Sequence, residues 1–71
     1  MSDVKTLGEE LPKEMARVRD VVIPAYQSIG PAGNFAVMMM RQDLDRAAKA
    51  MIEGDLVEMI RAYQSLKEAH T

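Results

Sequence analysis

The stretch MIEGDLVE, residues 51–58, decides how this chain folds. Glycine adopts a left-handed backbone at little steric cost, and helices commonly end in that conformation, so we expect Gly54 to end one. Asp55 stands where an N-cap is favoured, and Glu58 follows three residues later, which has capping-box character. The stretch therefore predicts a sharp turn between two helices.

Apolar residues recur at spacings of three and four on both sides of this turn, which is the repeat of an amphipathic helix. We expect helices at residues 34–53 and 55–70. The stripe of the first consists of Val37, Met40, Leu44, Ala47, Ala48 and Met51, and that of the second of Leu56, Met59, Ile60, Tyr63 and Leu66.

Residues 53–66 resemble the turn and second helix of a tetratricopeptide repeat. The residues that stand where the repeat pattern expects them are Gly54, Asp55, Glu58, Ile60 and Tyr63. The likeness covers about one helix, and Met59 and Leu66 replace the small residues of that family. Repeat arrays need at least about three units, more than 71 residues hold. The resemblance therefore implies an antiparallel helical hairpin rather than membership of the family.

A third helix is expected before the hairpin, at about residues 12–29, with a kink near Pro24. Proline in a helix interior removes one hydrogen bond and crowds the preceding turn, but the apolar stripe continues in phase beyond it. Gly30 and Pro31 then end this helix. We expect residues 1–10 to be loosely ordered.

Three helices joined by short loops predict an all-α, up-down-up bundle, because short connections make neighbouring helices antiparallel. At 71 residues, the chain is expected to form a single domain. A domain of this size buries only about 60% of the surface that its unfolded chain exposes. Small scaffolds gain stability from disulfides, a structural metal or oligomerisation. With no cysteine and one histidine, self-association is the route that remains.

The sequence offers little for other classes of function. The formal net charge of −2 provides no basic face for nucleic acid. His70 is the only histidine and lacks partners at helical spacing, so we expect no metal site. We also expect no catalytic residues, no cofactor and no small-molecule substrate. The start shows no signal-peptide pattern and no apolar run is long enough for a membrane span, so a cytoplasmic location is expected.

The motif AYQS occurs twice, at residues 25–28 and 62–65. Tyr26 and Tyr63 both lie on apolar stripes, so we interpret them as core residues rather than as a catalytic pair. In an up-down-up bundle they should lie at one end of the molecule, and with Met40 they should form a core cluster there.

The run NFAVMMM, residues 34–40, is apolar all round its helix, and its three methionines point about 100° apart. They cannot all face the core. We expect Phe35, Met38 and Met39 to form the contact surface for a second copy or another protein, since methionine suits adaptable surfaces. The alternative is that the N-terminal residues cover Met38 and Met39.

The sequence therefore predicts a small, noncatalytic protein–protein interaction or regulatory accessory module that self-associates as a homodimer or binds another protein. A small helical DNA-binding regulator using residues 34–53 and 55–70 is the alternative. Its candidate contact residues are Arg61, Gln64, Ser65 and Lys67.

Overall fold

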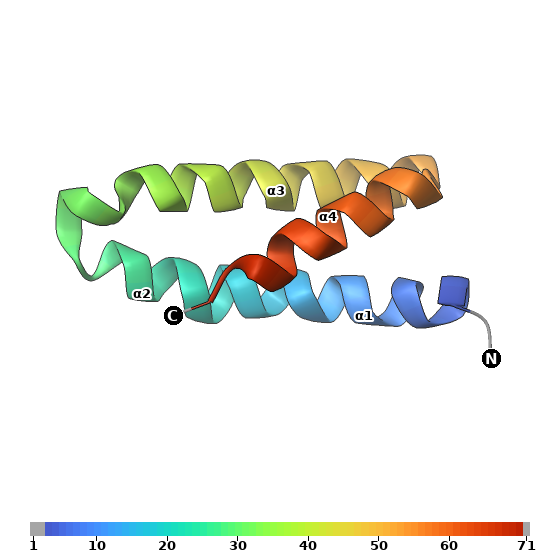
Figure 1. The fold of residues 1–71 in the computed structure, drawn as a ribbon, viewed down its shortest axis with the longest axis horizontal. Coiled ribbons are helices and arrows are strands. Elements are labelled where there is room, and N and C mark those ends of the chain that lie inside the picture. The colour runs from blue at the N-terminus through green and yellow to red at the C-terminus, as the bar shows by residue number, and fades with distance from the viewer. Residues whose placement is uncertain (1–2, 71) are drawn as a thin grey trace.

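The computed structural model describes the backbone of residues 3–70 and the side chains of residues 7–70. The expected all-α fold is confirmed, and no strand occurs among residues 3–70. A long bent helix packs against a hairpin of two further helices (Figure 1). The elements in order are α1 (Asp3–Arg17), a π-helical turn (Val18–Val22), α2 (Ile23–Gln27), a 3-10 turn (Gly30–Gly33), α3 (Asn34–Glu53) and α4 (Leu56–Glu68).

The first helix begins at Asp3, earlier than the start near Pro12 that we expected. The loose order expected of residues 1–10 stays a prediction, and residues 1–2 lie outside the described part of the chain. The apolar stripe extends further toward the N-terminus than we expected. Leu11 is fully buried, and Leu7, one helical turn earlier, packs against the same core. Pro12 lies inside α1 with its ring exposed, at a position where it gives up only the bond to the carbonyl of Gly8.

Pro24 does not end the helix, as predicted, because the chain stays helical through Gln27. The irregularity lies just before it, in the π-helical turn, where the backbone N–H of Ile23 donates to the carbonyl of Val18. Pro24 then occupies the first turn of α2, where its missing N–H is tolerated. This wider turn lets one continuous helix pass a proline in its interior.

The connection from α2 to α3 depends on two glycines for different reasons. Gly30 has a φ of 81°, the left-handed conformation expected for the residue after a helix. Gly33 is buried against the carbonyl oxygen of Tyr26, and a Cβ atom at this position would collide with that backbone. The close approach allows α3 to start directly beside α2.

The turn between α3 and α4 has the predicted form. Gly54 has a φ of 67°, and the N–H groups of Gly54 and Asp55 donate to the carbonyls of Met51 (3.3 Å) and Ala50 (2.9 Å). This is the Schellman pattern. The side chain of Asp55 caps α4 by accepting from the N–H of Glu58 at 3.2 Å. The reciprocal half of a capping box is not formed, because the Asp55 N–H is already bonded to Ala50.

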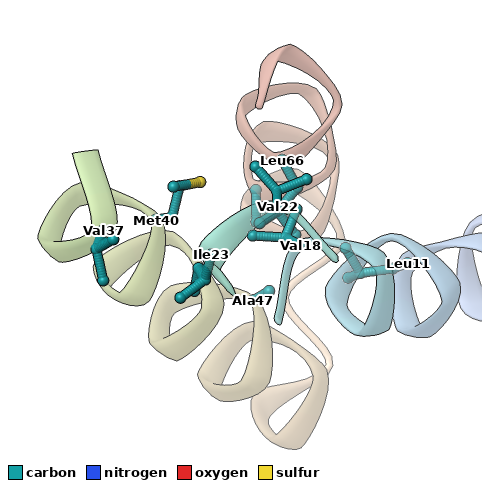
Figure 2. Packing of buried hydrophobic residues seen from close by; sticks show 9 residues of the cluster. Leu11, Val18, Val22, Ile23, Val37, Met40, Ala47 and Leu66 are labelled. Atoms are coloured by element: carbon teal, nitrogen blue, oxygen red, sulfur yellow. The ribbon is translucent and has the colours of Figure 1, made fainter. Parts of the chain in front are cut away.

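The core lies where α4 crosses the bent helix and α3. Figure 2 shows Leu66 of α4 beside Val18 and Val22, with Ile23 and Ala47 close by. The buried apolar residues of this cluster are Leu11, Val18, Val22, Ile23, Val37, Met40, Ala47, Ala62 and Leu66.

The C-terminal end of α4 is held against the first helix by a side chain. The Nη2 atom of Arg17 donates to the carbonyls of Leu66 (3.0 Å) and Ala69 (2.8 Å), and its guanidinium also pairs with Glu14 at 3.1 Å. The hydroxyl of Tyr26 donates to the carbonyl of His70 at 3.2 Å. These bonds fix the end of α4 beside the bend, so that α4 runs diagonally across the molecule (Figure 1).

Candidate interaction surfaces

The first turns of α3 carry an exposed apolar group that we call the methionine patch, formed by Phe35, Met38 and Met39. Their exposed fractions are 69%, 50% and 44%. Successive residues of the run 34–40 point in different directions around α3, and of its side chains only Val37 and Met40 are buried in the core. The sequence pattern predicted this division, because a run that is apolar all round a helix cannot point entirely inward.

The N-terminal helix does not cover the methionine patch. α1 begins at the opposite end of the molecule from the start of α3 (Figure 1). Met38 instead borders an open groove of about 420 Å³ between the end of α2 and α3. The groove is lined by Gln27, Asn34, Val37, Met38, Arg41, Gln42 and Asp45. The apolar patch therefore has a polar border on this side.

A second exposed apolar group surrounds the α3–α4 turn, and we call it the turn patch. It consists of Met51, Ile52, Leu56, Val57 and Ile60. Ile52 is 86% exposed, more than any other large apolar side chain given for the described part of the chain. We expected Met51, Leu56 and Ile60 to lie in buried stripes, and the exposure of this group is a correction to that expectation.

The physical reason for that difference is the direction of α4. It buries Ala62 and Leu66 against the bend, and Met59 and Tyr63 pack at the edge of the same core. The first turns of α4 lie farther from α1, because the helix crosses diagonally. Its stripe is wider than the surface available to cover it, so the side that carries Leu56 and Ile60 remains exposed.

The residues of the expected tyrosine cluster all belong to the core region. Met40 is buried, and Tyr26 and Tyr63 are partly buried against the same cluster. Phe35, which we placed at the contact surface, lies outside it. α4 ends beside the bend and does not extend to the start of α3 (Figure 1), so the core is centred on the crossing of α4 rather than on one end of the molecule.

Several charged side chains of the hairpin form ion pairs. Glu58 pairs with Arg61 at 3.2 Å and with Arg46 of α3 at 3.7 Å, which links the two helices of the hairpin. Partial burial is the main cause that raises the pKa of Asp43, while the nearby Arg46 lowers it and Glu68 raises it further. Arg46 and Glu58 also line an open hollow of about 240 Å³ between α3 and α4, together with Lys49, Ala50 and Glu53.

The described residues show no arrangement for metal chemistry. No group of three or more His, Cys, Asp and Glu side chains is placed to hold a metal ion within that part of the chain. Nor does any of the helices described here have the length and apolar character needed to cross a membrane.

Comparisons with protein-family models, with curated proteins and with solved structures gave no match to this chain. The two exposed apolar groups and the charges around them are the features of the molecule that bear on its function.

Proposed function

We propose that this chain is a noncatalytic protein–protein interaction module that self-associates. The observation that supports the proposal is the amount of apolar surface left exposed in two groups, the methionine patch and the turn patch. Contiguous apolar patches on small proteins frequently mark interaction sites, whereas single exposed apolar residues are ordinary.

The total surface of the molecule supports the same proposal. The chain exposes 4875 Å² for a mass of 7.9 kDa, whereas a compact monomer of that mass is expected to expose about 4,400 Å². A domain of this size has little stability to spare, and covering apolar surface in a complex adds to it. Association with a second copy or with another protein supplies that cover.

The test is the mass in solution as a function of protein concentration, measured by sedimentation from the micromolar to the millimolar range. We expect the mass to rise from 7.9 kDa toward twice that value. A mass that stays at the monomer value throughout the range would overturn the proposal of self-association.

The alternative that the sequence raised, DNA binding through the hairpin, has less support. Arg61 is paired with Glu58, and the Nζ atom of Lys67 lies 5.5 Å from the ring centre of Tyr63. Both cations of α4 that we considered as groove contacts already have intramolecular partners. Retention of the chain on duplex DNA at low salt would favour this alternative, and a steep loss of retention with added salt would support it further.

A further inference from the structure

Three consecutive methionines in the first turns of α3 differ sharply in their exposure. Met38 and Met39 have exposed fractions of 50% and 44%, whereas that of Met40 is 6%. Successive side chains of a helix point about 100° apart, so the helical backbone itself sets this difference. Met40 belongs to the buried cluster (Figure 2). The run therefore holds two accessible thioether groups directly beside a buried one.

Met38 and Met39 lie on one continuous surface of α3. Phe35 lies three residues before Met38 and four residues before Met39, and these spacings make side chains neighbours on a helix. The exposed phenyl ring thus adjoins both methionines. A change of polarity at the two sulfur atoms therefore alters most of the methionine patch.

The thioether sulfur of methionine undergoes two-electron oxidation by peroxides. A sulfur lone pair attacks one oxygen of hydrogen peroxide, and the O–O bond breaks. The proton of the transferred oxygen passes to the leaving hydroxide, which becomes water. Sulfur is oxidised to the sulfoxide while the peroxide is reduced. The sulfoxide is polar and chiral, and methionine sulfoxide reductases convert it back to the thioether.

The surroundings of Met38 suit a sulfoxide oxygen. Met38 lines the open groove of about 420 Å³ between α2 and α3, together with side chains that carry N–H donors. These are Gln27, Asn34, Arg41 and Gln42. Oxidation at Met38 places a new acceptor beside these donors and solvent. At Met40 the same oxygen would enter an apolar core, where an unpaired polar group is costly.

We infer that Met38 and Met39 form a reversible oxidation site, at which hydrogen peroxide converts an apolar surface of α3 into a polar one without unfolding the helix. Met40, the next residue along the chain, is spared because it is buried. The inference goes beyond the proposed self-association, since it concerns access of a small oxidant to a single chain.

Limited oxidation followed by peptide mass spectrometry tests the inference. The chain is treated with dilute hydrogen peroxide at the lowest protein concentration of the sedimentation series, where association protects the surface least. Fragmentation of the peptide that contains residues 38–40 assigns each added oxygen. We expect Met38 and Met39 to be oxidised at least about tenfold faster than Met40, whose sulfur reacts only after local opening.

Two further measurements follow the oxidised chain. Circular dichroism should show unchanged helix content, because the two oxidised side chains lie outside the core. Methionine sulfoxide reductases specific for the two sulfoxide epimers should then remove the oxygens from Met38 and Met39.

Met38→Leu/Met39→Leu is the matched control, since leucine keeps the apolar character and a similar volume. Oxidation should shorten the retention of the wild-type chain on a hydrophobic-interaction column, and the double variant should lose most of that shift. Met51, which is 37% exposed at the other end of α3, remains in both chains and accounts for the residual shift.

The outcomes are distinct from those that decide the proposed function. Oxidation of Met38 and Met39 no faster than that of Met40, or a loss of helix content as they react, would overturn the inference. A sulfoxide that the reductases leave in place, or an undiminished retention shift in the double variant, would do the same. Self-association is decided separately, by sedimentation of the untreated chain.

Discussion

Arg17 shows how one long side chain connects the two parts of the molecule. It ends α1, and its side chain is 34% exposed because it lies against the end of α4. The last carbonyl groups of a helix have no partners within that helix. The guanidinium of Arg17 donates to two carbonyls at the C-terminal end of α4, with a positive charge near the negative end of the helix dipole.

Replacing Arg17 by alanine should lower the free energy of unfolding by about 1–3 kcal/mol, since two charge-assisted hydrogen bonds and the pair with Glu14 are lost. Urea denaturation followed by circular dichroism measures the change. Lys13→Ala is the matched control, because the Lys13–Glu10 pair is largely exposed and should contribute less than about 1 kcal/mol. Equal losses in the two variants would show that Arg17 does not hold α4.

Gly33 is required between α2 and α3 because it has no side chain. Gly33→Ala places a Cβ atom against the carbonyl of Tyr26 and within 3.2 Å of Cγ1 of Ile29. The backbone must shift to accommodate it, so we expect a loss of about 1–3 kcal/mol or more in thermal or urea unfolding. Gly8→Ala is the control: a Cβ there has no neighbour within 4 Å, and the change should stabilise α1 by about 0.5–1 kcal/mol. Equal effects of both substitutions would contradict the close contact.

At the scale of whole elements, the boundary between α3 and α4 can be traced to local signals. Gly54 and Asp55 end α3 and begin α4 through backbone bonds and one side-chain cap. The bent helix lacks such a boundary at Pro24, because the π-helical turn before it compensates for the missing N–H. The start of α1 differs from the one that we expected, because the helix begins at Asp3 and neither Gly8 nor Pro12 interrupts it.

The Asp55 cap gives a prediction at this scale. Asp55→Ala should lower the free energy of unfolding by about 1 kcal/mol, because the N–H of Glu58 loses its acceptor at the start of α4. Asp55→Asn keeps a carbonyl oxygen in the same position and should lose much less. Melting temperatures of the two variants provide the comparison, and an alanine variant as stable as the wild type would mean that α4 does not depend on this cap.

At the scale of the whole molecule, an elongated shape accounts for the exposed apolar surface. The principal extents are 41 × 20 × 15 Å. α3 has 20 residues and α4 has 13, so α4 cannot cover the full length of α3 and the bent helix. Phe35, Met38 and Met39 lie at the start of α3, whereas Met51 and Ile52 lie at its end, so the two exposed apolar groups are far apart along the molecule (Figure 1).

The sequence by itself determined the all-α class, the bounds of α3, the left-handed Gly30 and Gly54, the Asp55 cap and the exposure of Met38 and Met39. These features depend on backbone conformation and on periodicity within a few neighbouring residues, which can be read locally. Only the tertiary structure decided that α4 crosses diagonally, that Arg17 reaches its C-terminal carbonyls, and that Leu56 and Ile60 stay exposed. Apolar periodicity identifies the side of a helix that is favoured for burial. Relative helix lengths and crossing angles determine how much of that side another helix buries.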